Sequence, residues 1–276
     1  MSVFDRDIGS WEHLARTDPL WAVLSTEEFR GGTLTPEAEA RFWASGQQHV
    51  DHVLAIIEGE LDPGFAPSVS LDFGCGVGRN LIPLAGRSGW AIGLDASPTM
   101  VARATGRAAD CRAGNVEALV VGRTIDAEAV RRHGRVDFIH SVLVFQHIVA
   151  ADGLALFDQL LELLDHGGHG FVQFQARNPG GELDRGLRAL RFGHGWFNAV
   201  ATKSRIRRLA DLVMLYEYDP IDLLRHLAAH AVSDVVVERV PSGPDGYELR
   251  LYFTKFDGSD EAFAQAGRPM KVRVRP

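Results

Sequence analysis

The sequence predicts an α/β protein with a mainly parallel sheet and helices on both faces. From residue 68 onward, short runs of β-branched and aromatic residues alternate with stretches at helical spacing, which is typical of parallel sheets. Only residues 241–246 separate the last two strand-like runs, and so short a connection requires an antiparallel pair. A hydrophobic content of 46% over 276 residues is ample for a core.

Residues 1–66 are expected to form a helical cap that precedes the first strand. Thr35 followed by Pro36 predicts the start of a helix, because threonine caps helices and proline fits the first helical position. Apolar or small residues then recur at helical spacing. They are Phe42, Gly46, Val50, Val53, Leu54 and Ile57.

The sheet and its helices are expected over residues 67–255. The predicted strands are 69–73, 90–94, a short one near 111–112, 136–140, 170–175, 235–237 and 249–253. Three helices are predicted among these strands. One begins after Ser97, one carries the apolar stripe from Leu154 to Leu164, and one begins after Asp219. Residues 256–276 are expected to be a C-terminal tail.

A basic insertion is expected at about residues 177–215, between the fifth strand and the helix capped by Asp219. Residues 177–208 hold eight basic and two acidic side chains, in a chain whose net charge is −7. This segment could attract a phosphate or carboxylate on a substrate, or it could simply be a solvated face.

Composition excludes several classes of protein. An acidic chain with a pI near 5.9 is a poor non-specific binder of nucleic acid. Two cysteines cannot form a disulfide framework, and no apolar run is long enough to span a bilayer. The first residues lack the basic and apolar blocks of a signal peptide, so we expect a cytoplasmic protein.

A glycine-rich loop follows the first strand and precedes a helix. Gly74, Gly76 and Gly78 allow the backbone to turn tightly and to approach a ligand closely. Asp95 ends the second strand, where a carboxylate can accept both hydroxyl protons of a ribose. The loop and the acid together indicate a nucleoside-containing cofactor; a purely structural turn is the alternative.

The spacing of the loop disfavours a dinucleotide. Dinucleotide sites use G-x-G-x-x-G, and here Arg79 occupies the position of the last glycine. Asp72, two residues before the first glycine, would repel a pyrophosphate but attract the ammonium group of an amino acid. A nicotinamide-dependent oxidoreductase therefore remains only as an alternative.

Five ordered motifs resemble those of the class I S-adenosylmethionine (SAM)-dependent methyltransferases of small-molecule type. They are Asp72-x-Gly74-x-Gly76-x-Gly78, Gly93-Leu94-Asp95-Ala96-Ser97-Pro98, Gly114-Asn115-Val116-Glu117, the fourth-strand region from Asp137 to Ile148, and the turn Gly167-Gly168. The resemblance covers about residues 40–255. It implies a Rossmann-like sheet of seven strands with the last pair antiparallel, and SAM as the cofactor.

The resemblance also implies a role for each matching residue. Gly74 and Gly76 would pass under the cofactor, with Cys75 between them as a small loop residue. Asp72 would lie near its amino group, and Asp95 would hold the ribose hydroxyls. The adenine would contact Ala96, Asn115 and Val116. Many members of the family have aspartate at the position of Asn115. Ser141 would border the methionine moiety.

His147, after the fourth strand, is the candidate catalytic residue. A hydroxyl acceptor must lose its proton as it attacks, and a neutral imidazole at working pH can accept it. The alternative is that His147 packs or binds water at the start of a helix. No histidine or cysteine cluster has the spacing of a metal site, so no metal is expected.

The expected function is methyl transfer to a small-molecule acceptor, with a hydroxyl of a sugar or natural product as the target. Three other functions remain open: a nicotinamide-dependent oxidoreductase, an RNA methyltransferase using the basic insertion, and a binding protein without turnover. Phe42, Trp43, Gly46 and Gln47 could touch the methionine end of the cofactor or the acceptor. The alternative is that Phe42 and Trp43 simply pack their helix on the sheet. The sequence leaves the acceptor and the oligomeric state undefined.

Overall fold

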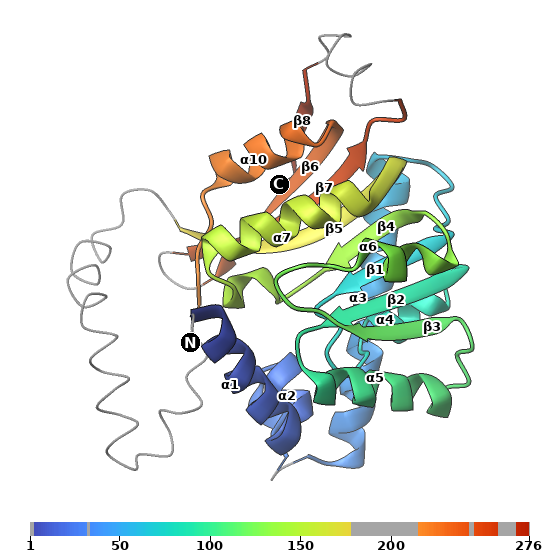
Figure 1. Cartoon of the computed structure of the whole chain (residues 1–276), viewed down its shortest axis with the longest axis vertical. Helices are drawn as coiled ribbons and strands as arrows, with labels where there is room; N and C mark the ends of the chain where they lie inside the picture. Colours follow the sequence, from blue (N-terminus) through green and yellow to red (C-terminus); the bar gives the residue numbers. More distant parts are fainter. Residues whose placement is uncertain (1–2, 32–33, 178–214, 243–245, 259–268, 276) are drawn as a thin grey trace, which may run out of the picture.

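The structure is a computed structural model that describes residues 3–31, 34–177, 215–242, 246–258 and 269–275. The expected basic insertion falls outside the described residues except at its two ends. The described residues form one central sheet with helices on both faces and a helical segment at the N-terminal side (Figure 1).

The predicted α/β class is confirmed, and the described sheet has eight strands instead of the expected seven. The strands are β1 (Val69–Phe73), β2 (Trp90–Asp95), β3 (Val116–Val120), β4 (Val136–Ser141), β5 (Leu164–Arg177), β6 (Val232–Ser242), β7 (Gly246–Lys255) and β8 (Lys271–Arg275). Their order in the sheet is β3-β2-β1-β4-β5-β7-β6-β8.

Strand direction agrees with the prediction from the short connection. β1 to β5 are parallel, whereas β7 runs antiparallel to both β5 and β6. β8 pairs in parallel with β6 and supplies the additional strand, within the stretch expected to be a tail. The order reverses between β1 and β4, so the chain leaves these neighbouring strands in opposite directions, which opens a crevice at their carboxyl ends.

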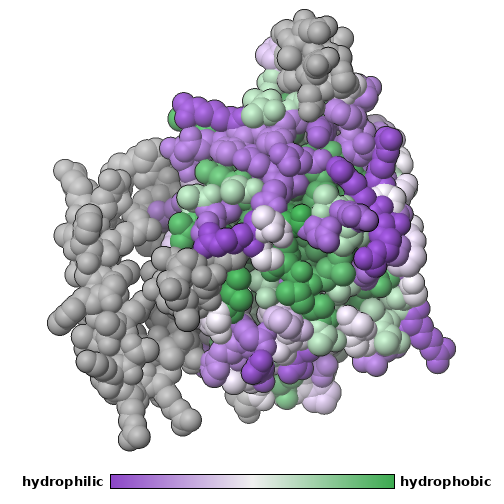
Figure 2. Space-filling view, in the orientation of Figure 1, coloured by the Kyte–Doolittle hydropathy of each residue, from purple (hydrophilic) through white to green (hydrophobic). Residues whose placement is uncertain are grey.

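Helices cover both faces of the sheet. The helical elements are α1 (Val3–Thr17), α2 (Pro19–Val23), η1 (Glu27–Phe29), α3 (Pro36–Glu60), α4 (Leu81–Ala85), α5 (Pro98–Asp110), α6 (Ala127–Val130), η2 (Arg131–His133), η3 (Phe145–His147), α7 (Ala150–Leu163) and α10 (Pro220–Ala229). One apolar cluster joins the sheet to α7 and α10, and another joins it to α3, α4 and α5. Figure 2 shows hydrophilic residues over α10 and α7 and apolar residues gathered below α7.

α3 begins and packs as its sequence predicts. The Thr35 hydroxyl accepts a hydrogen bond from the amide of Ala38 at 3.2 Å, which caps the helix. All six residues of the predicted face are buried, and they lie against the sheet or the N-terminal helices. α1, α2 and η1 pack on the start of α3 and on α5 through a smaller apolar cluster.

The predicted position of the third strand was wrong. Cys111 caps the C-terminus of α5, and Arg112 has a left-handed backbone with φ of 56°. The strand begins four residues later, at Val116, which pairs with Ala91 of β2. This displacement matters for the site, because it moves Asn115 and Val116 to the amino end of the strand.

Candidate functional site

The glycine loop lies at the carboxyl end of β1 and has the backbone that its sequence predicts. Gly74 and Gly76 have φ of 76° and 54°, a region that other residues rarely adopt. A Cβ at Gly74 would collide with Val144, and one at Gly76 would lie 2.7 Å from a methyl carbon of Val23. Glycine is therefore required here by both backbone conformation and space.

Asp95 ends β2 beside this loop. Its Oδ2 accepts a hydrogen bond from the Gly76 amide at 2.9 Å, and its Oδ1 accepts one from the Ser97 amide at 2.8 Å. Burial raises the pKa of Asp95 to about 6 against the effect of these two bonds, and the charges of Asp72 and Glu12 add to the increase. The carboxylate is thus desolvated and positioned to accept further hydrogen bonds.

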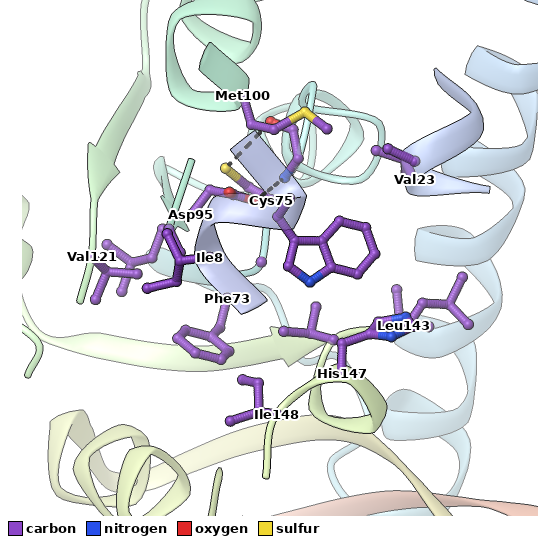
Figure 3. Close-up of a pocket in the computed structure, with 18 of the residues that line it drawn as sticks. Ile8, Val23, Phe73, Cys75, Asp95, Met100, Val121, Leu143, His147 and Ile148 are labelled. Atoms are coloured by element: carbon purple, nitrogen blue, oxygen red, sulfur yellow. Dashed lines mark hydrogen bonds between the residues drawn. The ribbon is translucent and has the colours of Figure 1, made fainter. Parts of the chain in front are cut away.

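A pocket connects the loop, Asp95 and the N-terminal helices (Figure 3). In this view Val121 and Ile8 lie at one end, Val23 and Leu143 lie at the other, and Asp95 lies between them. Its wall is built from α1, α2, α7 and the segments that follow β1 to β4. The lining residues are Ile8, Trp11, Ala22, Val23, Phe73, Gly74, Cys75, Gly76, Arg79, Asn80, Leu94, Asp95, Ala96, Met100, Val121, Gly122, Val142, Leu143, Val144, His147, Ile148, Val149 and Leu156.

His147 lies on the pocket wall, in η3 after β4. Its Nε2 is 3.1 Å from Nε2 of Gln146. Trp11 from α1 meets the imidazole edge to face, with ring centroids 4.7 Å apart. An N-terminal helix therefore covers the candidate base directly.

A carboxylate on α1 holds that helix across the pocket. Glu12 accepts hydrogen bonds from the hydroxyls of Ser97 and Thr99, each at 2.6 Å. These two bonds are the main reason that the pKa of Glu12 falls to about 2. Because Ser97 and Thr99 follow Asp95, this contact joins the covering helix to the segment next to Asp95.

The structure brings six of the ten predicted site residues to the pocket wall. They are Gly74, Cys75, Gly76, Asp95, Ala96 and His147. The other four, Asp72, Asn115, Val116 and Ser141, are not among its lining residues. Ser141 is buried, and its hydroxyl donates to the carbonyl of Phe73 at 2.9 Å, so it joins β4 to β1 while Val142 lines the pocket.

Asp72 lies behind the wall, in a buried polar chain. Its Oδ1 is 2.7 Å from Nδ1 of His140, and Nε2 of His140 is 3.0 Å from Nε2 of His49. Burial, followed by the nearby charge of His140, lowers the pKa of His49 to about 2, so His49 is neutral. Oδ2 of Asp72 has no hydrogen-bond partner in the described part of the chain.

The prediction for Asn115 and Val116 needs correction. Val116 pairs with Ala91 near the amino end of β2, whereas Asp95 lies at the carboxyl end. The Asn115 side chain donates to the carbonyls of Ala85, Ser88 and Gly89. Asn115 and Val116 precede or begin β3, whereas the residues that follow β3 and line the pocket are Val121 and Gly122.

Sequence reasoning also missed Arg79 and Asn80 as pocket residues. From the sequence alone, Arg79 indicates only that the loop does not fit a dinucleotide, yet both residues line the pocket. Phe42, Trp43, Gly46 and Gln47 do not line it. Phe42 packs on Phe29 and Trp43 lies under Arg107, so both pack their helix, but on the N-terminal elements and α5 and not on the sheet. Gln47 binds Asp51.

Two further features concern metals and membranes. No group of three His, Cys, Asp or Glu side chains within the described ranges is arranged to hold a metal ion. No helix in the same part of the chain is long and apolar enough to cross a membrane.

Comparison with known proteins identifies a methyltransferase domain and its fold. Residues 71–168 match the family described as a methyltransferase domain, whereas no curated protein matches the chain. Magnesium protoporphyrin IX methyltransferase from Synechocystis PCC 6803, solved with bound S-adenosylhomocysteine (SAH), superposes with a TM-score of 0.54 at 20% identity. That similarity covers 86% of this chain and 93% of the other.

Two other solved structures share the fold over 75% of this chain, both with a TM-score of 0.52. The N-terminal domain of EvdMO1, with SAH bound, is 15% identical and is 80% covered. Phosphoethanolamine N-methyltransferase 2 of Haemonchus contortus, in complex with phosphomonomethylethanolamine and SAH, is 16% identical and 53% covered. Residues 71–168 are thus a methyltransferase domain, in a chain that has the fold of SAM-dependent methyltransferases and brings a glycine loop and Asp95 to one pocket.

Proposed function

We propose that this methyltransferase moves a methyl group from SAM to a hydroxyl group of a small molecule, such as a sugar or natural product. The observation that carries the proposal is the pocket that joins the glycine loop, Asp95 and His147. It lies at the carboxyl ends of β1, β2 and β4, where the strand order reverses and where α/β proteins bind ligands.

The pocket residues fit the parts of SAM. The ionised carboxylate of Asp95 would accept hydrogen bonds from the ribose hydroxyls, since two backbone amides already fix its orientation. Ala96 and Val121 offer apolar surface for the adenine, at the end of the pocket where Ile8 also lies. Gly74 and Gly76 line the pocket and pack against the side chains of Val144 and Val23, so the cofactor would lie beside these two valines.

The chemistry that SAM supplies is a methyl group already activated by the sulfonium. The protein then has to align the acceptor and exclude water, and alignment alone can contribute about 7–11 kcal/mol. His147 would accept the hydroxyl proton as the oxygen attacks. Trp11 lies against the imidazole and would shield that proton from solvent.

Replacing His147 with alanine tests the base. We expect turnover to fall about 100-fold and the rise of the rate with pH to disappear, while SAH affinity changes little. His52→Ala is the matched control, because His52 is an exposed histidine on α3. A His147→Ala variant that keeps full turnover at every pH would remove the base assignment.

Product analysis tests the acceptor class. Incubation with methyl-labelled SAM and a panel of hydroxyl and amine acceptors should place the label on oxygen, as read by mass spectrometry. Calorimetry should show binding of SAM and SAH and none of NAD. Label on nitrogen or carbon would overturn the hydroxyl assignment, and affinity for RNA that falls steeply with salt would replace the small molecule with RNA.

A further inference from the structure

His147 lies in η3, a single 3₁₀ turn between β4 and α7. The His147 amide donates to the Val144 carbonyl at 2.9 Å, and the Ile148 amide donates to the Phe145 carbonyl at 3.0 Å. No side chain in the described ranges caps the start of the turn. One turn of 3₁₀ helix is weak by itself, because it forms few hydrogen bonds and their geometry is poor. The position of the imidazole therefore depends on what binds the turn from outside.

Tyr216 and Tyr218, in the segment that leads into α10, bind the carbonyls of this turn. The Tyr218 hydroxyl lies 3.0 Å from the carbonyl oxygen of Phe145 and 2.9 Å from that of Ile148, so its proton can be shared between them. The Tyr216 amide donates to the Gln146 carbonyl at 2.7 Å. Three carbonyls in and beside η3 are thus bonded by one short segment that is far away in the sequence.

Tyr218 is itself fixed to the sheet. It is 3% exposed, and its amide donates to the Gln175 carbonyl at 2.8 Å. Its ring packs on that of Phe174, with centroids 4.9 Å apart. Gln175 and Phe174 both belong to β5. Because a buried tyrosine hydroxyl needs a hydrogen-bond partner, and its partners here are the carbonyls of η3, Tyr218 connects that turn to the sheet.

α7 leaves room for the Tyr218 hydroxyl. A Cβ at Gly153, near the start of α7, would collide with that hydroxyl. Glycine is less favourable than alanine inside a helix, so its presence here fits the need for space. Burial, followed by the negative charge of Asp152, raises the pKa of Tyr218 well above its ordinary value. The hydroxyl therefore stays protonated and remains a donor to the turn.

The imidazole of His147 is sensitive to the position of this turn. Nε2 of Gln146, whose carbonyl the Tyr216 amide binds, is 3.1 Å from Nε2 of His147. Trp11 lies against the other side of the turn, with its ring centroid 4.7 Å from that of the imidazole. A general base must come within about 2.6–3.2 Å of the atom whose proton it takes, so a small shift of η3 would remove it from reach.

We propose that Tyr218 is a positioning residue for methyl transfer, whose hydroxyl fixes η3, together with the Tyr216 amide, and thereby holds the imidazole of His147 beside Trp11. Tyr218 does not line the pocket, so it acts through His147 and not on the ligands. This role rests on the proposed function, in which His147 is the base. The competing explanation is that Tyr218 only stabilises the fold.

Tyr218→Phe removes the hydroxyl and keeps the ring. With methyl-labelled SAM and the hydroxyl acceptor that gives the fastest turnover, we expect kcat to fall about 10- to 100-fold and its rise with pH to weaken. SAH affinity, measured by calorimetry, should change less than about twofold, which also shows that the variant is folded. Tyr252→Phe is the matched control, because Tyr252 is a buried tyrosine on β7 that does not line the pocket. It should keep the turnover and the pH profile of the wild type.

A double-mutant cycle separates positioning from general stabilisation. In the His147→Ala background, Tyr218→Phe should lower kcat no further, because the two residues act as one unit. Gly153→Ala breaks the same contact from the other side, since the added Cβ would displace the Tyr218 hydroxyl. It should lower kcat as Tyr218→Phe does. Gly106→Ala is its control, because a Cβ at this exposed position in α5 would meet open space.

Nuclear magnetic resonance measures the position of the imidazole without an acceptor. In a chain with labelled histidine and tryptophan, the signal that is lost in His147→Ala identifies His147. Its nuclear Overhauser effect to Trp11 reports the contact between the two rings. Tyr218→Phe and Gly153→Ala should each weaken or abolish this effect, whereas Tyr252→Phe should leave it unchanged.

The outcomes distinguish this role from the proposed function. If Tyr218→Phe leaves either the ring contact or the pH profile as in the wild type, the role of Tyr218 is overturned while His147 stands as the base. If Tyr218→Phe lowers kcat by the same factor with and without His147, Tyr218 only stabilises the fold, which overturns the role as well. Full turnover by His147→Ala would instead overturn the base, and the role of Tyr218 with it.

Discussion

The two ends of the parallel strands differ in the hydrogen bonding of their polar side chains. At the amino end, Asn115 donates to three carbonyls, and the Asp137 carboxylate accepts from the amides of Ser68 and Val69 at 2.8 and 2.9 Å. At the carboxyl end, Arg79 and Asn80 each retain an unpaired polar atom within the described residues. Polar side chains at the amino end are thus paired within the fold, whereas these two at the pocket are only partly paired.

A left-handed residue and a desolvated carboxylate also lie in the pocket wall. Leu143, in the pocket wall, has a left-handed backbone with φ of 62°, a strained conformation for a leucine. Asp95 keeps a carboxylate whose pKa is raised mainly by burial. Such strain and desolvation are characteristic of functional sites, because the surrounding fold holds what local energetics disfavour.

The largest expected effect comes from Asp95→Asn at the carboxyl end. Loss of the carboxylate should weaken SAH at least about 100-fold, because two charge-assisted hydrogen bonds to the ribose are lost. The free energy of unfolding at pH 7 should change little, because removal of the desolvated charge offsets the loss of one of the two backbone hydrogen bonds that the carboxylate accepts. Calorimetry measures SAH affinity, and denaturant titration measures the free energy of unfolding. A variant that loses stability but keeps its SAH affinity would show that Asp95 serves the fold and not the ligand.

Asn115→Ala at the amino end should do the opposite. We expect the free energy of unfolding to fall by about 1–3 kcal/mol, because the carbonyls of Ala85, Ser88 and Gly89 lose a donor. SAH affinity should be unchanged, since Asn115 lies away from the pocket. Weaker SAH binding by a folded Asn115→Ala variant would restore the adenine role expected from its motif.

The pH dependence of binding follows from Asp95. Because burial raises its pKa to about 6 and ribose hydroxyls donate to the ionised form, SAH binding should release a proton near pH 6. Affinity should fall about tenfold from pH 7 to pH 5. Calorimetry in buffers of different ionisation enthalpy detects the proton, and Asp95→Asn should abolish the release.

The raised pKa of Asp95 affects folding stability in the opposite direction: stability falls as the pH rises. A carboxyl whose pKa is higher in the folded state binds its proton more tightly there, so folding is favoured below the unfolded pKa. This contribution decreases as the pH rises from about 4 through 6. In thermal unfolding of the ligand-free chain, the wild type should therefore lose stability relative to Asp95→Asn as the pH rises across that range.

The smallest expected effect concerns Glu12. Glu12→Ala should speed SAH dissociation a few-fold, because α1 loses its bonds to Ser97 and Thr99, and should cost about 0.5–1 kcal/mol of stability. Stopped-flow kinetics measures the rate. Arg16→Ala is the control, since Arg16 is an exposed partner of Glu12 that does not line the pocket. Equal rates in all three proteins would show that α1 does not limit release.

Elements with strong local patterns could be predicted from the sequence. The caps Thr35, Ser97 and Asp219 each accept a backbone hydrogen bond at the helix starts expected of them. The glycine loop and Asp95 also lie where their spacing placed them, at one pocket. These features depend on side chains close in sequence, or on strand ends that a parallel sheet brings to one edge.

By itself, the sequence determined the α/β class, the antiparallel strand pair, the loop and the acid beside it. Only the tertiary structure decided that β3 begins at Val116, that β8 joins the sheet and that α1 covers His147. It also decided that Arg79 faces the pocket while Asp72 faces His140. These outcomes depend on contacts between residues far apart in the chain, and local residue patterns do not specify which partners such contacts join.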